Sequence, residues 1–170
     1  MWSIPRRRFP KQPAMNTNDL EKLNTAVEFL IRQKTVLETI ERLDEEADRS
    51  QEPFVWSVIE LDSIAQPLPE TIKSCWIFVL KKNVPSGCHY HPNSIQHMVT
   101  IKGHGRQQIA GQSKRLGQFE WVIIDQNVPH EFFPEDENMV VISFHTCEAN
   151  ELEEIGCDTG AQRLYTESTS

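Results

Sequence analysis

Two histidines one residue apart, followed later by a third, are the residues whose types and spacing point most directly to chemistry. His89 and His91 follow the turn-forming stretch Pro-Ser-Gly, and His130 follows a Val-Pro turn in a later segment. On an extended strand, side chains two residues apart point to the same side, so the first two imidazoles can reach one ligand. Neutral imidazoles are common ligands of divalent transition metals such as Fe, Mn, Ni and Zn. We therefore predict one such metal at these three histidines; the alternative is that they are polar turn residues.

Gln96, which follows the histidine pair in a β-like run, is the candidate for an oxygen donor at this site. Its side-chain oxygen can bind a metal as a neutral donor, weaker than a carboxylate. It can equally be a pocket residue that bonds water or substrate. No further residue is assigned a catalytic role. The predicted substrate pocket consists of residues that strand alternation or nearness in sequence places beside these groups: Met98, Thr100, Phe132 and His145.

The segments that carry these residues have the pattern of short β-strands. Between residues 53 and 147 the sequence contains apolar runs rich in Val, Ile, Phe and Trp, among them FVWSVIEL, SCWIFVLKK and NMVVISFHTC. Turn residues such as PSG, KGHG and PEDEN separate these runs. Short strands at this spacing predict a mainly-β domain, a sandwich or a barrel, over residues 51–147.

Residues 17–50 have the periodicity of helix instead. Asn18 with Glu21, and Thr35 with Glu38, match the capping box that begins a helix, and the second match predicts a break near Lys34. The apolar stripe of this segment must be buried, either against the main domain or in a homodimer contact, and the two alternatives remain equal. The stripe consists of Leu20, Leu23, Val27, Leu30 and Leu37, with Val36, Ile40 and Leu43.

The histidine pattern resembles the first motif of the cupin superfamily of small β-barrels. That motif has a turn with Gly, then His-x-His, four residues, Glu, six residues and Gly. Here His89, His91, Gln96 and Gly103 stand at those positions. The sequence departs from the family in having Gln96 where the acidic ligand stands.

The second motif of the family is matched more loosely. It has a Gly, a Pro-x-Gly turn, two residues and a His; here Gly117, the stretch DQN at 125–127 and His130 take those places. The Asn that often follows the last His is absent, because Pro134 stands there. The resemblance extends over residues 75–146.

The resemblance implies a jelly-roll β-barrel preceded by helices, and a metal-dependent protein that acts on a small molecule. Dioxygenases are the leading class implied, with His89, His91 and His130 as metal ligands and Gln96 as a fourth ligand or as the group that orients oxygen. The alternative is a non-catalytic cupin that binds a small ligand or stores a metal, and the missing carboxylate favours it. Neutral donors leave the metal its full charge, so we expect the substrate to be anionic.

Composition and charge narrow the function classes. The 170 residues carry a net charge of −8, which argues against nucleic acid as a main partner because phosphate binding needs a basic face. No apolar run approaches the length needed to cross a bilayer, so we expect no membrane partner. The four cysteines lack CxxC spacing, which predicts free thiols in a reducing, cytoplasmic setting, with Cys88 a small filler beside the site.

The two ends of the sequence differ from its middle. Residues 1–16 are rich in Pro and Arg and are predicted to form a disordered basic tail, and Met1 and Met15 are both candidates for the true start. Residues 148–170 are acidic and are predicted to be a peripheral extension.

Overall fold

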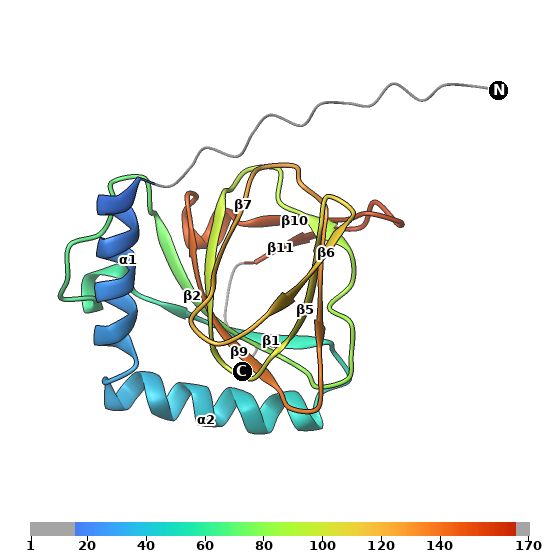
Figure 1. Ribbon diagram of the computed structural model, residues 1–170, viewed down its shortest axis with the longest axis horizontal. Coiled ribbons are helices and arrows are strands. Elements are labelled where there is room, and N and C mark those ends of the chain that lie inside the picture. Colours follow the sequence, from blue (N-terminus) through green and yellow to red (C-terminus); the bar gives the residue numbers. More distant parts are fainter. Residues whose placement is uncertain (1–15, 166–170) are drawn as a thin grey trace.

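Two antiparallel β-sheets packed as a barrel, preceded by two helices, make up the computed structural model, which describes residues 16–165 (Figure 1). The first sheet has the order β1-β2-β9-β4-β7, with bounds Phe54–Ile59, Ser74–Leu80, Met139–His145, Gln96–Lys102 and Trp121–Ile124. The second has the order β11-β10-β3-β8-β5-β6, with bounds Gln162–Leu164, Glu153–Gly156, His89–Tyr90, His130–Pro134, Gly105–Ile109 and Gln112–Leu116. The mainly-β fold predicted from the sequence is confirmed.

Strand β2 shows how the core is divided between two faces of the first sheet. All seven of its residues are buried. Cys75, Ile77 and Val79 belong to a hydrophobic cluster that includes the helices, whereas Trp76 and Phe78 belong to a second cluster inside the barrel. Since successive side chains of a strand point to opposite faces, a continuous apolar run is what a strand covered on both faces requires.

The two helices begin and end close to where the sequence predicts. α1 spans Thr17–Leu30 and α2 spans Lys34–Arg49, so the predicted break near residue 34 is confirmed. The predicted caps are wrong. Asn16, not Asn18, caps α1, because its side chain accepts a hydrogen bond from the backbone N–H of Asp19 (3.1 Å). α2 begins after Gln33, and this residue makes no side-chain capping bond.

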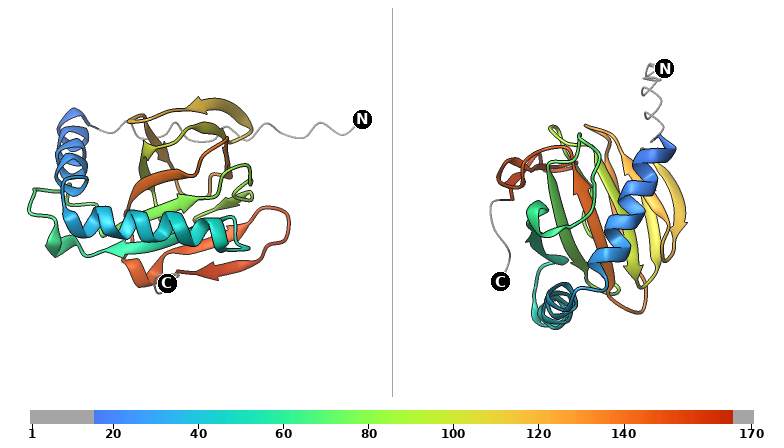
Figure 2. Two further views of the ribbon diagram at one scale, coloured as in Figure 1. Left: turned by 90° about the horizontal axis from the view of Figure 1, so that it is seen from below. Right: turned by 90° about the vertical axis from the view of Figure 1, so that its left-hand side faces the viewer.

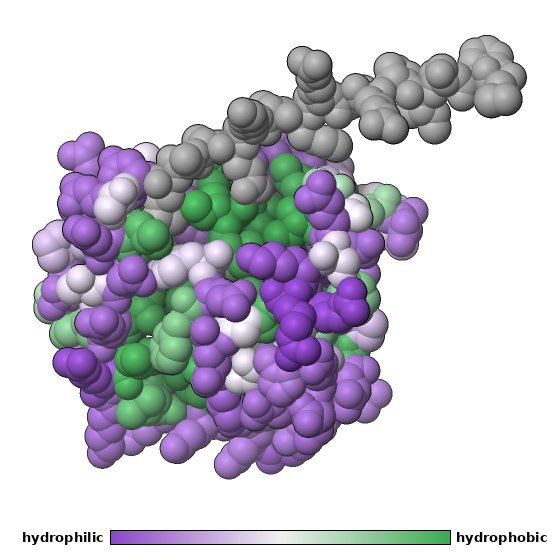
Figure 3. All heavy atoms as spheres, viewed as in Figure 1, coloured by the Kyte–Doolittle hydropathy of each residue, from purple (hydrophilic) through white to green (hydrophobic). Residues whose placement is uncertain are grey.

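Both helices lie across the outer face of the first sheet (Figure 2). Leu23, Leu30 and Leu43 are at most 1% exposed and pack in one cluster with residues of that sheet. The apolar stripe is therefore buried within the chain, which is the first of the two alternatives. Leu37 is an exception at 44% exposed. The outward side of α2, along the lower edge of the space-filling view, is hydrophilic (Figure 3).

The segment after residue 147 is part of the barrel, which corrects the prediction of a peripheral extension. β10 pairs with β3, with Gly156 opposite His89, and β11 adds a further strand outside β10.

A disulfide joins Cys88 to Cys157, so the prediction of four free thiols is also wrong. Their Cα atoms lie 5.5 Å apart, within the range that a disulfide spans, although 69 residues separate them in sequence. Two cysteines, Cys75 and Cys147, are free and buried.

Residues 1–15 and 166–170 lie outside the described residues, and the prediction for the basic tail falls there apart from Asn16. Within residues 16–165, neither helix combines the length and the apolar character that crossing a membrane requires.

Candidate metal centre

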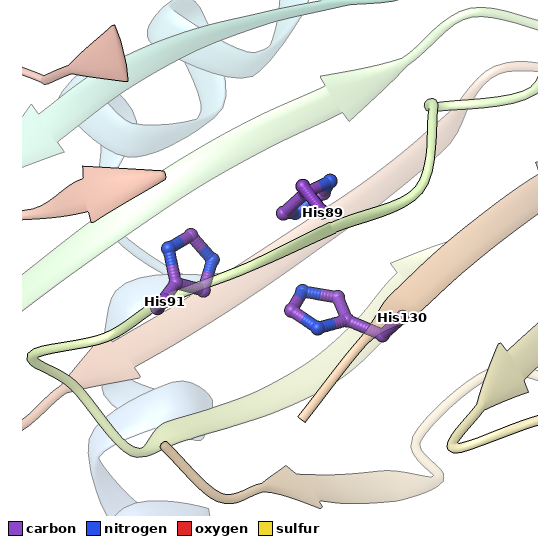
Figure 4. A group of neighbouring side chains, drawn as sticks. All are labelled: His89, His91 and His130. Carbon is purple, nitrogen blue, oxygen red and sulfur yellow. The ribbon is translucent and has the colours of Figure 1, made fainter. Parts of the chain in front are cut away.

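His89, His91 and His130 come together inside the barrel (Figure 4). His89 in β3 is the register partner of His130 in β8, and His91 follows β3 directly. The ring centroids of His89 and His130 lie 4.3 Å apart, and that of His91 lies 5.2 and 5.3 Å from them. One ring nitrogen from each lies within 4.8 Å of the others, and all three residues are buried. This group can hold a metal ion.

Backbone carbonyls hold all three rings in the same protonation pattern. The Nδ1 atoms of His89, His91 and His130 lie 2.9, 2.7 and 2.9 Å from the carbonyl oxygens of Gly87, Glu153 and Val128. A carbonyl oxygen only accepts, so each Nδ1 carries the hydrogen and each Nε2 keeps a lone pair. This second shell of hydrogen bonds is the usual arrangement around histidines that bind metals. The Nε2 of His130 is buried and has no hydrogen-bond partner among residues 16–165, as a metal ligand requires.

Burial keeps the rings of His91 and His130 neutral. Loss of solvent, followed by repulsion from His89, lowers the pKa of His91 to about 4 from its ordinary 6.5. Burial, with repulsion from His89 and His91, lowers the pKa of His130 well below its ordinary value. Neutral imidazole is the form that binds metal, so both ligands are ready at neutral pH.

A cavity of about 390 Å³, its open mouth included, adjoins the histidines. His89 and His91 line it, and Met98 and Phe132 are among its apolar walls. Gln96 and His145 contribute polar groups. A concave, mostly apolar site with a few converging polar groups is typical of small-molecule pockets.

The family model of the cupin domain matches residues 76–145. The chain contains a cupin domain. The resemblance of the histidine motifs is thereby confirmed. The structure also explains why the first motif has a glycine at position 103. Its φ is +80°, and a Cβ there would lie 2.6 Å from the carbonyl oxygen of Asn138, so the turn after β4 requires glycine.

Solved structures with the same fold include enzymes and a seed protein. The oxalate decarboxylase of Lactobacillus farciminis, solved as a formate complex, is 16% identical, with a TM-score of 0.51 over 64% of this chain and 32% of that one. The salicylate 1,2-dioxygenase of Pseudaminobacter salicylatoxidans is 10% identical, with a TM-score of 0.50 over 63% and 33%. The coconut allergen cocosin is 18% identical, with a TM-score of 0.51 over 63% and 29%. At these identities the likeness shows the cupin fold alone.

This chain spans about a third of the length of each of these three proteins. No curated protein matches the sequence.

Gln96 of the cupin domain lies in β4 with its side chain in the cavity. Its amide NH₂ donates to the hydroxyl of Ser143 at 3.2 Å and lies 3.5 Å from the sulfur of Met98. Its Oε1 is buried, and within the described part of the chain it has no hydrogen-bond partner. A free carbonyl oxygen in the cavity beside the histidines fits either predicted role, metal ligand or pocket residue.

His145, the last residue of β9, lies in the same cavity. Its ring centroid is 5.3 Å from that of His91, and its Nδ1 lies 2.8 Å from the hydroxyl oxygen of Ser94. That hydroxyl also lies 3.2 Å from the carbonyl of Ile95, to which it can donate. When it does, His145 Nδ1 donates to Ser94, and the unpartnered Nε2 has a free lone pair.

Three of the four predicted pocket residues line the cavity: Met98, Phe132 and His145. Thr100 does not. It is fully buried two residues further along β4, next to a bulge in the pairing with β9. Sequence reasoning missed Tyr165, which lines the cavity from the end of the described chain, because a single Tyr after an acidic segment carries no signal of its position.

Proposed function

We propose that this cupin is a metal-dependent dioxygenase-type oxidoreductase that acts on a small, anionic molecule. One observation carries the proposal: His89, His91 and His130 present metal-binding nitrogens to one point, and backbone carbonyls fix all three rings in the required tautomer. Three buried imidazoles that converge on one point have no evident structural use, whereas a divalent metal uses all three.

The residues around this point have distinct tasks. The three histidines would hold the ion, and a bound ion would supply a Lewis acid at the point where oxygen and substrate bind. Apolar walls such as Phe78, Met98 and Phe132 exclude water from that point. The polar groups of Gln96 and His145 are placed to orient a bound molecule.

The charge of the site favours an anionic substrate. Three imidazoles and an amide are neutral, so they cancel none of the double positive charge of the ion. A carboxylate, enolate or thiolate in an open position gains from that charge. Inside its walls the cavity leaves only about 30 Å³ for the centres of water-sized molecules, so the site admits only a small molecule.

A second candidate is a non-catalytic cupin that binds a small ligand or stores a metal. The observation that favours it is Gln96, which stands where the family has its acidic ligand. Metal-assisted chemistry that needs a carboxylate at this position is then excluded, but binding is not.

Oxygen consumption by the Fe(II)-loaded protein tests the proposal. A panel of thiols, diketones and phenolic acids is offered, with His91→Ala as the variant that loses metal. We expect at least one compound to drive oxygen uptake in the wild type and not in the variant. Binding of these compounds without oxygen uptake would support the non-catalytic candidate instead.

A further inference from the structure

Glu154 brings a carboxylate to the histidine group from the C-terminal segment. β10 runs antiparallel to β3, with Gly156 opposite His89 and Ile155 opposite Tyr90. Side chains two residues apart on a strand share a face, so Glu154 points to the same side as Gly156 and the histidines. Its Oε2 lies 3.9 Å from Nε2 of His89, and the two side chains are only 13% and 10% exposed.

A buried hydroxyl orients this carboxylate. The hydroxyl of Tyr165 donates to the same Oε2 of Glu154. Tyr165 is 2% exposed, packs against the rings of Trp56 and Trp76, and its backbone N–H donates to the carbonyl of Leu152 at 2.9 Å. Glu154 is therefore held toward the histidines by a rigid neighbour rather than placed there as a free surface acid.

The neighbouring charged groups have partners of their own, although Arg163 also contacts Tyr165, with its guanidinium 5.8 Å from the centre of that ring. Arg163 is opposite Glu154 in register, but its guanidinium pairs with Glu52 at 3.9 Å and lies 5.3 Å from the ring centre of Phe54. Glu153, the preceding residue, accepts a hydrogen bond from Gln162 on β11. Of the two adjacent glutamates, only Glu154 faces the site.

We propose that Glu154 supplies a carboxylate ligand to the metal held by His89, His91 and His130. The inference rests on the proposed metal site. Two donor atoms that each lie about 2.1 Å from one ion are at most about 4.2 Å apart, so the 3.9 Å between Glu154 Oε2 and His89 Nε2 permits an ion between them. Among the described residues, the group of donor atoms within 4.8 Å of one another contains the three histidines alone, so to bind the ion that they share, the Glu154 side chain must move closer to His91 and His130. The acidic donor missing at Gln96 is then replaced from a different strand.

The carboxylate changes what the site prefers. It cancels one of the two positive charges of a divalent ion, and it is a harder donor than imidazole or amide, which favours ions such as Mn(II) and Fe(II). The Tyr165 hydroxyl becomes the outer hydrogen bond that orients this ligand. One positive charge remains, so an anionic substrate is still favoured.

Metal titration of matched variants tests the proposal without an activity assay. The variants are Glu154→Gln, Glu154→Asp, Tyr165→Phe and the control Asp158→Asn, which alters an exposed carboxylate in the turn after β10. Mn(II) affinity is measured by competition with a chelator, and the absorption bands of bound Co(II) report the ligand set. Thermal unfolding identifies which variants are folded.

We expect Glu154→Gln and Glu154→Asp to weaken Mn(II) binding at least about tenfold and to shift the Co(II) bands. The first variant loses the carboxylate, and in the second the side chain is too short for its carboxylate to reach the ion. Tyr165→Phe should weaken binding less, and Asp158→Asn should match the wild type. Wild-type affinity and bands in either folded Glu154 variant would overturn the inference and leave the three-histidine site intact. Absence of metal binding in the wild type would overturn the proposed function and this inference together.

Discussion

His91 Nδ1 donates a hydrogen bond to the backbone carbonyl of Glu153 across 2.7 Å, which joins residues 62 positions apart in the sequence. Through this bond, strand β10 orients His91, a candidate metal ligand. β10 follows strands β1 to β9 in the sequence. The residue after Glu153 is the carboxylate proposed as a further ligand. The C-terminal segment therefore belongs to the metal centre as well as to the sheet.

The disulfide should stabilise this arrangement measurably. Cys157→Ser removes the link between β3 and β10, and removal of a native disulfide typically costs about 2–4 kcal/mol of unfolding free energy. Urea unfolding with and without a reductant measures the effect. The wild type in reductant should fall to the stability of the variant, and the variant should not respond to reductant. Equal stabilities of the two proteins in oxidising buffer would contradict the prediction.

Part of this structure could be predicted from sequence, because it depends on local periodicity. The alternation that places His89 and His91 on one side holds in any strand, and the covered strands β2 and β9 follow from continuous apolar runs. The prediction that the whole helical stripe is buried is wrong at Leu37, for a physical reason. Leu37 continues the spacing of α1, but the break at residues 31–33 changes the direction of the helix axis, so the phase of α1 does not carry into α2.

The rest depends on contacts between distant segments. Strand β10 has the sequence Glu-Glu-Ile-Gly, which contains no apolar alternation, and only its pairing with β3 and β11 makes it a strand. The Cys88–Cys157 bond and the approach of Glu154 to His89 both follow from that pairing. Spacing within the sequence contains no information on such partners.

The buried helical stripe can be tested with a charge. Leu30→Asp places a carboxylate at a site that is 1% exposed and should cost roughly 2 kcal/mol or more of unfolding free energy. Leu37→Asp, at a site 44% exposed, is the matched control and should change stability by less than about 0.5 kcal/mol. Chemical unfolding measures both. A loss as large in the control as in Leu30→Asp would mean that burial is not the cause.

The metal-free protein should lose stability as the pH falls below 6.5. His91 has a folded pKa of about 4 against an ordinary value of 6.5, so between these values the unfolded chain binds more protons and gains free energy. From pH 7.5 to 5 this residue alone accounts for about 2 kcal/mol of lost stability, and the effect ends below pH 4. Urea unfolding in chelator compares the wild type with His91→Gln. The variant should lose less stability over this range; the same loss in both would contradict the assignment.

A new carboxylate at Gln96 should weaken anion binding. Two unit charges about 4 Å apart interact by roughly 4 kcal/mol at an effective dielectric near 20, and even a fraction of this is visible in affinity. Gln96→Glu should therefore bind Mn(II) more tightly, and its metal-loaded form should bind azide or oxalate more weakly than the wild type. Gln118→Glu, at an exposed site, is the control. Equal or tighter anion binding in Gln96→Glu would show that Gln96 does not influence the metal.

Elemental analysis of the protein purified without an affinity tag tests the central claim most directly, with His91→Ala as the test variant and the half-exposed His104→Ala as the control. We expect about one transition metal per chain in the wild type and in His104→Ala. We expect loss of most of the metal in folded His91→Ala, because the remaining donors hold an ion poorly. Full metal content in His91→Ala, or none in the wild type after incubation with Fe(II), Mn(II), Ni(II) and Zn(II), would contradict that claim.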